Sequence, residues 1–176
     1  GQKVGEAPAF VSAPVHASVS GKVKAVEPRI HFSGVPVMSV VIDNDFNDTP
    51  CPSLAPPADP EKLTAEQISN LVKEAGIVGM GGATFPTHVK ISSGLGKVDT
   101  VIVNASECEP YITSDHRTLL EHPEEVLGGV RILAKLFGVD WVHIAIEANK
   151  ANAAEMLKIK IAEEKAPAVV DVLQTR

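Results

Sequence analysis

Over the first 48 residues, apolar and polar side chains alternate in short runs separated by glycine, proline and serine. Alternation with a period of two is typical of β-strands that bury one face, and the separating residues are typical of turns. The pattern predicts four short strands, at residues 10–11, 17–19, 22–26 and 35–42. Together they would form a small β-domain over residues 1–48.

Residues 49–60 separate this β-domain from the rest of the chain. They hold five of the thirteen prolines, which fix the backbone and prevent a continuous helix. Thr64 and Gln67 then have the spacing of a capping box, and apolar residues follow at helical intervals until Gly76. The pattern therefore predicts a proline-rich linker and, after it, a helix from about residue 64 to residue 75.

The remainder of the chain alternates between strand and helix patterns. Three apolar runs predict strands, at residues 100–103, 139–147 and 167–174. Helical spacing of apolar residues predicts two helices between them, which begin near Pro123 and Asn149. This order predicts an α/β domain over residues 61–176 with a Rossmann-like parallel sheet, whose ligands bind beyond the carboxyl ends of the strands. Because the sequence stops at Arg176, directly after the third strand, we expect this domain to be truncated at its C-terminus.

Composition narrows the possible functions. The 176 residues carry a formal net charge of −6 and 44% hydrophobic side chains, enough for a packed core. No cluster of lysine and arginine offers a track for a phosphate backbone, which argues against nucleic acid as a partner. The apolar runs are far shorter than the roughly 20 residues that cross a bilayer. The two cysteines and six histidines lack the spacing of metal ligands, so we expect no metal site and a reducing, cytoplasmic setting.

A glycine-rich segment, residues 79–90, precedes the first strand of the α/β domain. Gly79, Gly81 and Gly82 lack side chains, so a flat ring or a phosphate can lie against bare backbone and meet its N–H groups. Phe85 could stack on a planar base, and Lys90 adds a cation for a phosphate. The alternative is a tight loop with a packed phenylalanine. The segment is neither a P-loop nor the usual Rossmann fingerprint, because no Gly-Lys-Ser/Thr follows and it precedes a strand.

An acidic segment, residues 104–117, begins where the first strand of that domain ends. By the strand-end rule a nucleotide would bind here, and four side chains offer acceptors for ribose or for polar ring edges: Asn104, Ser106, Glu107 and Glu109. Carboxylates at this point favour hydroxyl groups and repel phosphates. The alternative is an acidic loop near a helix N-terminus, where the helix dipole stabilises the two glutamates without any ligand.

Together the two segments resemble the GxGGAxFPxxxK and NxxExEP loops of the flavin-binding subunit of respiratory NADH dehydrogenase (complex I). The order Glu-Cys-Glu-Pro-Tyr followed by Ser-Asp-His-Arg is more similar to the RnfC family, the related flavoproteins of the Rnf-type ion-translocating electron transport complex. The resemblance covers nearly the whole chain. Five positions depart from the complex I pattern, which has Arg, Gly, Asp, Gly and Gly there: Met80, Thr84, Ser106, Cys108 and Tyr111.

The resemblance implies an electron-transfer subunit that binds FMN and NADH. It implies nine cofactor-binding residues: Gly79, Gly81, Gly82 and Lys90 facing FMN, Phe85 stacked on NADH, Asn104 on the flavin, and Ser106, Glu107 and Glu109 near flavin or nucleotide. In this family hydride passes from the nicotinamide to the flavin and single electrons pass on to iron-sulfur clusters, so no catalytic side chain is expected. The 4Fe-4S clusters are expected in a C-terminal part that this sequence lacks, and the fragment alone is expected to be inactive.

The resemblance also implies partners and a location. These are the other subunits of a membrane-bound complex, NADH as substrate, ferredoxin as an indirect partner, and a peripheral place on the cytoplasmic side of the cell membrane. Residues 1–48 resemble the barrel-sandwich hybrid of lipoyl and biotinyl carriers. Because neither Met-Lys-Met nor Asp-Lys-Ala occurs, we expect this domain to be unmodified.

Two alternatives to flavin chemistry stay open at this point. One is a non-catalytic docking or assembly module without bound flavin, and the other is a carrier domain with an attached group. The flavin hypothesis depends on one geometric condition: the glycine-rich and acidic segments must converge on one side of the sheet, leaving a slot for a flat three-ring system.

Overall fold

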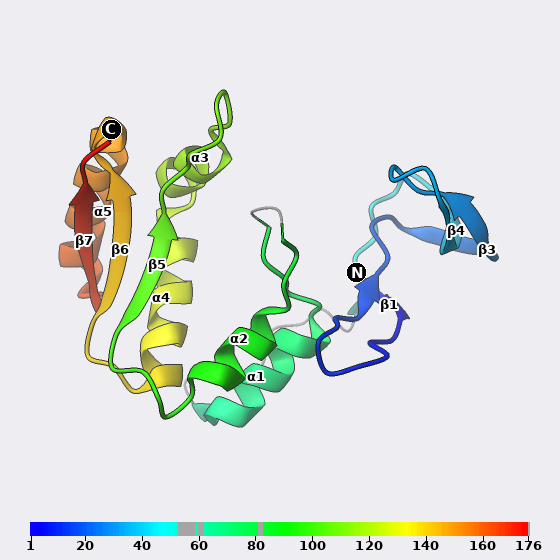
Figure 1. Cartoon of the computed structure of the whole chain (residues 1–176), viewed down its shortest axis with the longest axis horizontal. Helices are drawn as coiled ribbons and strands as arrows, with labels where there is room; N and C mark the ends of the chain where they lie inside the picture. Colours follow the sequence, from blue (N-terminus) through cyan, green and yellow to red (C-terminus); the bar gives the residue numbers. More distant parts are fainter. Residues whose placement is uncertain (53–58, 60–61, 81–82, 176) are drawn as a thin grey trace. The chain divides into compact units, whose positions relative to one another are not determined.

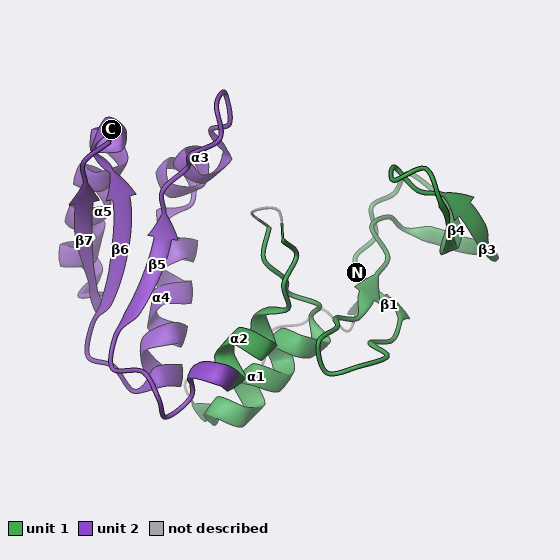
Figure 2. Cartoon of the chain, in the orientation of Figure 1, with its two compact units in different colours: residues 1–92 green, residues 93–176 purple. Residues whose placement is uncertain are grey.

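The computed structural model describes residues 1–52, 59, 62–80 and 83–175. The chain forms two compact units, residues 1–92 and 93–176, and each is described by itself (Figure 2). Gly81 and Gly82 lie outside the described residues, as does most of the predicted linker.

The first unit contains four strands: β1 (Lys3–Gly5), β2 (Val15–His16), β3 (Gly21–Ile30) and β4 (Pro36–Asn44). β1 pairs with β2 and β3 with β4, both antiparallel, so the described residues form two separate two-stranded sheets and no closed barrel. The strands predicted at residues 22–26 and 35–42 are confirmed in β3 and β4. Those predicted at residues 10–11 and 17–19 are wrong, because these residues lie in bends and irregular backbone beside β2. Runs of two or three apolar residues are too short to specify a pairing partner.

One face of the β3–β4 ribbon is apolar. Residues opposite each other in an antiparallel pair point to the same side, and every second residue of a strand shares that side. Three such pairs are wholly apolar: Val26 with Val40, Pro28 with Met38, and Ile30 with Pro36. Val26, Ile30 and Met38 are largely exposed. In the described part of the chain, this ribbon therefore presents a mostly uncovered apolar face.

Two helices, α1 (Ala65–Glu74) and α2 (Thr87–Gly94), follow β4 in the chain. The predicted capping box of α1 is confirmed: Gln67 N–H donates to Thr64 Oγ1 at 3.2 Å, and Thr64 N–H donates to Gln67 Oε1 at 2.8 Å. The extension of the glycine-rich loop through residue 90 is wrong, because residues 87–90 are helical. Helix α2 has only eight residues and a weak amphipathic pattern, so its sequence carries no clear helical period.

His88 anchors α2 within the first unit. Its ring is only 3% exposed, its Nε2 lies 3.0 Å from the carbonyl oxygen of Phe10, and the two rings meet edge to face at 5.7 Å. Nδ1 of His88 has no hydrogen-bond partner among the described residues. Burial of this ring against the segment before β2 explains why a short helix forms directly after the glycine-rich loop.

The second unit is built on three parallel strands: β5 (Val101–Ala105), β6 (Val142–Glu147) and β7 (Ala168–Leu173), in the order β5-β6-β7. Helix α4 (Pro123–Phe137) connects β5 to β6, and the short η3 (Ala148–Lys150) and α5 (Ala151–Glu164) connect β6 to β7. The predicted β-α-β-α-β order and its parallel sheet are confirmed. The predicted helix start at Pro123 is also confirmed, as is the stop at Gly138, whose left-handed φ of 65° ends α4.

The core of this unit lies between the sheet and two helices. Figure 1 shows α4 and α5 against the same face of the sheet. Val142, Ile144 and Ile146 of β6 point to that face and are fully buried, together with Leu127 of α4 and Leu157 of α5. Alternate residues of the strands, such as Ile102, point to the other face and are more exposed. The sheet therefore buries one face within the second unit.

Helix α3 (Ser114–Glu121) lies between β5 and α4 and was not predicted. The sequence led us to expect a loop over residues 104–117, so its last four residues are helical instead. The N-cap position, Thr113, makes no side-chain hydrogen bond to the helix, so the local capping signal is absent. The groups that satisfy this helix end come from farther away in the chain.

Candidate functional site

The stem of the glycine-rich loop is a closed hairpin in the first unit. Val78 and Pro86 form an antiparallel bridge, and Gly79 N–H donates to the carbonyl oxygen of Phe85 at 2.9 Å. Thr87 N–H donates to the carbonyl oxygen of Ile77 at 3.1 Å. These bonds hold the two ends of the loop together, so the loop projects from a fixed base.

The stem brings three of the predicted residues together: Gly79, Phe85 and Lys90. A Cβ added to Gly79 would lie 3.6 Å from Nζ of Lys90 and 3.7 Å from the backbone nitrogen and oxygen of Phe85. The Phe85 residue is 38% exposed, and Lys90 is exposed on the first turns of α2. Bare backbone and an ammonium group thus lie side by side, which suits a phosphate or a polar ring edge.

The acidic segment leaves the carboxyl end of β5 in the second unit. Oδ1 of Asn104 accepts a hydrogen bond from Ser106 N–H at 3.1 Å, so the asparagine turns the chain away from the sheet. Asn104 is exposed and Ser106 is half-buried. Both therefore lie where the strand-end rule expects ligands to bind.

The Glu107 side chain is turned into the protein and is only 4% exposed. Its carboxylate accepts hydrogen bonds from the backbone N–H groups of Asp115 (2.9 Å) and His116 (3.4 Å) and from Oγ of Ser114 (3.2 Å). Glu107 thus supplies the N-terminal cap that Thr113 does not give to α3. Its predicted contact with flavin or nucleotide stays a prediction.

The pKa of Glu107 is lowered, although its burial acts in the opposite direction. Burial alone would raise the pKa, but the N–H groups of Asp115 and His116, the hydroxyl of Ser114 and the charge of Lys150 outweigh it. Because each of these groups favours the charged form, the carboxylate is held ionised at neutral pH.

The lowered pKa predicts how stability changes with acid. Ionised Glu107 contributes stability that is complete above the pKa of an unfolded glutamate and is lost as the pH falls through the lower folded-state pKa. Glu107→Gln should therefore lower the melting temperature at neutral pH and flatten its decline on acidification. The single tryptophan, Trp141, lies in the second unit and can report this unfolding by fluorescence. Glu109→Gln, at an exposed neighbour, is the matched control, and equal acid sensitivity of Glu107→Gln and the unvaried chain would contradict the assignment.

The sequence analysis missed two residues that meet Glu107 from the end of β6. Oε2 of Glu147 accepts a hydrogen bond from Glu107 N–H at 3.2 Å, and Nζ of Lys150 lies 3.8 Å from Oε2 of Glu107. Nearby, His116 on α3 and Asn152 on α5 are joined by a 2.9 Å hydrogen bond. Because neighbouring parallel strands end at the same edge, the strand-end rule applied to β6 as well as to β5 could have found Glu147 and Lys150.

The tip of the acidic loop is exposed. Cys108, Glu109 and Tyr111 all point to solvent, and the Tyr111 backbone has a left-handed φ of 65°. Glycine adopts this region freely, whereas tyrosine adopts it only when its surroundings impose it. This explains why the complex I pattern has glycine at the position of Tyr111, and it shows that the loop is held in one particular conformation.

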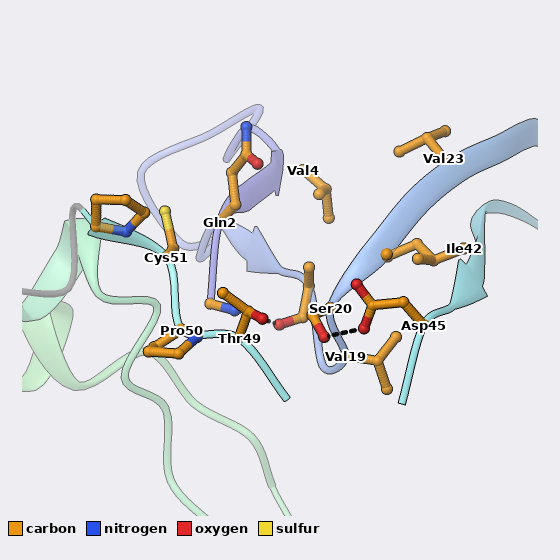
Figure 3. Close-up of a pocket in the computed structure, with 14 residues that line it drawn as sticks. Gln2, Val4, Val19, Ser20, Val23, Ile42, Asp45, Thr49, Pro50 and Cys51 are labelled. Atoms are coloured by element: carbon orange, nitrogen blue, oxygen red, sulfur yellow. Dashed lines mark hydrogen bonds between the residues drawn. The ribbon is translucent and has the colours of Figure 1, made fainter. Parts of the chain in front are cut away.

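A half-open cavity of about 340 Å³ lies elsewhere in the first unit (Figure 3). Its lining includes Val4, Val19, Val23 and Ile42, with a hydrogen bond of 2.5 Å from Ser20 to the carboxylate of Asp45 at its rim. As far as the structure describes this lining, it contains none of the nine predicted site residues. Among the described residues, no group of three or more His, Cys, Asp and Glu side chains could hold a metal ion.

Comparison with protein families identifies the chain. The model of the RnfC barrel sandwich hybrid domain matches residues 1–47, and that of the Nuo51 FMN-binding domain matches residues 72–176. The chain belongs to the Nuo51 FMN-binding domain family, as an RnfC member. The resemblance inferred from the two loop motifs is therefore confirmed.

Relatives of this RnfC-family chain agree with that assignment. It is 52% identical over 158 residues to the RnfC-type subunit of the Na(+)-translocating ferredoxin:NAD(+) oxidoreductase complex of Acetobacterium woodii, covering 89% of this chain and 36% of that protein. It is 40% identical over 159 residues to the same type of subunit in the proton-translocating complex of Clostridium ljungdahlii, covering 90% and 35%. The RnfC-family chain thus spans about a third of the length of these relatives.

A solved structure shows the same fold. The RnfC-family chain is similar to a chain of an NAD+-reducing [NiFe]-hydrogenase in the H2-reduced state, with a TM-score of 0.51 and 22% identity over 62% of this chain and 21% of that one. At this identity the likeness concerns the fold alone. In the described part of the chain, no helix combines the length and hydropathy that a membrane span requires.

Proposed function

We propose that this chain forms the FMN-binding part of an electron-transfer subunit that exchanges electrons with NADH. The observation that carries the proposal is the stem of the glycine-rich loop, where the backbone of Gly79 and the ammonium group of Lys90 lie beside each other. The family assignment supports it, since the matched domain over residues 72–176 is described as FMN-binding.

The residues present fit such a cofactor. Gly79 leaves bare backbone for close approach, Lys90 supplies a cation for the FMN phosphate, and Asn104 supplies polar atoms at the carboxyl end of β5. FMN, when bound, supplies a hydride acceptor that can release electrons one at a time. The side chains bind and orient, Phe85 is proposed to stack on NADH, and Ser106 and Glu109 to lie near flavin or nucleotide. No side chain is required to act as an acid or base.

The proposal requires the two loops to converge, although they lie in different compact units. It also places the 4Fe-4S clusters in the part of the relatives that this chain does not span, and a peripheral position on the cytoplasmic side of the membrane. The partners proposed are other subunits of the complex and NADH, with ferredoxin as an indirect partner. The names of the relatives, which are subunits of ferredoxin:NAD(+) oxidoreductase complexes, support this proposal.

The test uses a chimera in which this chain replaces the corresponding third of the Acetobacterium woodii protein, to which it is 52% identical. The purified chimera should bind FMN, seen as flavin absorbance, and NADH should bleach that absorbance under anaerobic conditions. A correctly folded chimera without flavin affinity would favour the docking module. An added mass on a lysine of residues 1–48 would favour the carrier domain.

A further inference from the structure

Glu107 is held at both its backbone and its side chain by the end of β6. Glu147, the last residue of β6, accepts the Glu107 N–H at 3.2 Å, and Lys150 of η3 places its Nζ 3.8 Å from the Glu107 carboxylate. The two contacts come from residues three apart and reach opposite ends of Glu107. The glutamate is therefore fixed to the neighbouring strand and not only to its own loop.

Glu107 in turn closes the acidic loop. Its carboxylate binds the first N–H groups of α3, at Asp115 and His116, so the chain from residue 107 to residue 116 begins and ends on one side chain. The exposed tip between these points carries Glu109 and Tyr111, and Tyr111 has the left-handed backbone described above. A tip of this kind keeps its conformation only if the residue that closes the loop is itself fixed.

The charges at this position need one another. Glu107 and Glu147 bring two carboxylates to the same end of the sheet, and the Lys150 side chain is only 15% exposed beside them. Two nearby carboxylates of like charge repel in a setting that water screens poorly, so the cation offsets this repulsion. Without it, Glu107 would lose part of its reason to stay buried against α3.

We propose that Glu147 and Lys150 are positioning residues of the flavin site: acting through Glu107, they hold the loop of residues 108–113 in the conformation that meets the cofactor. This inference rests on the proposed function for its consequence, but the clamp itself is a property of the second unit. Neither residue touches the cofactor in this proposal, and both act only through Glu107.

The first experiment varies Lys150 in the chimera. Lys150→Met should weaken FMN affinity about tenfold or more, whereas Lys150→Arg, which keeps the charge, should restore it to within about threefold. It should also shift the flavin midpoint potential to more negative values, because the Glu107 charge is left without its cation. Lys158→Met, at an exposed lysine of α5, is the matched control and should change neither quantity.

The second experiment varies Glu147 in the 176-residue chain, without flavin. Glu147→Ala removes the acceptor of the Glu107 N–H, whereas Glu147→Gln retains an oxygen that can accept it. Amide hydrogen exchange at residues 107 and 114–116 should accelerate severalfold in Glu147→Ala and in Lys150→Met, and stay close to the unvaried rate in Glu147→Gln.

The two sets of results separate this inference from the proposed function. If the unvaried chimera binds no flavin, the proposed function fails, and the exchange rates alone then support or overturn the clamp. Unchanged exchange in both Glu147→Ala and Lys150→Met overturns the clamp. Faster exchange together with unchanged flavin affinity and potential overturns the positioning role. A Lys150→Arg variant as weak as Lys150→Met would also overturn it, because charge would then not be the property that matters.

Discussion

Replacing Ile144 with alanine should destabilise the second unit by about 2–5 kcal/mol. Ile144 is fully buried at the centre of β6, between β5 and β7, and it packs beneath α4 and α5. Truncation removes buried methyl groups and leaves a cavity that the sheet can fill only in part, because its backbone hydrogen bonds fix the strands. A loss of this size is a large fraction of the roughly 5–15 kcal/mol that stabilises a typical domain.

Urea unfolding followed by Trp141 fluorescence and by circular dichroism measures this change. Ile102→Ala is the matched control, because Ile102 lies on the next strand but points to the other face and is 65% exposed. It should cost less than about 1 kcal/mol. Equal losses for the two variants would mean that the face turned away from α4 and α5 is as well packed as the core, contrary to the fold described above.

Gly79→Ala should lower flavin affinity by about tenfold or more while leaving the fold intact. The added Cβ would meet its nearest neighbours, Nζ of Lys90 and the backbone of Phe85, at 3.6–3.7 Å, which is ordinary van der Waals contact. Alanine therefore fits into the protein itself. The methyl group would nevertheless occupy the space between bare backbone and ammonium group in which the cofactor is proposed to bind.

Flavin titration of the chimera, together with its melting temperature, tests this separation of binding from folding. Gly128→Ala is the control, because a Cβ at Gly128 on α4 meets nothing within 4 Å. That variant should bind flavin normally and gain up to about 1 kcal/mol from the better helix former. Full flavin affinity in a folded Gly79→Ala variant would show that the ligand does not approach this backbone.

Elements with local signals could be predicted from the sequence. The capping box at Thr64 and Gln67, and the start and stop of α4 at Pro123 and Gly138, depend on neighbouring residues and were confirmed. Helix α3 could not be predicted in this way, because its cap is Glu107, which lies before the N-cap position and on the far side of a loop. Helix α2 likewise depends on burial of His88 against Phe10, a contact across 78 residues.

The same distinction applies to the candidate site. Sequence motifs indicated Gly79, Phe85 and Lys90, which the structure brings together in one hairpin stem. They could not indicate Glu147 and Lys150, because these contact Glu107 only after the two strands have paired in parallel. Motifs show which residues are available for binding, whereas the side chains that fix them are revealed by strand register.

The apolar face of the β3–β4 ribbon affects how the isolated chain behaves in solution. Exposed hydrocarbon surface of this kind promotes self-association and binds hydrophobic dyes. The hydrodynamic radius of the chain should therefore increase with concentration, and mild detergent should reverse that increase. For the same reason, the melting and exchange measurements described above are comparable only between samples at equal dilution.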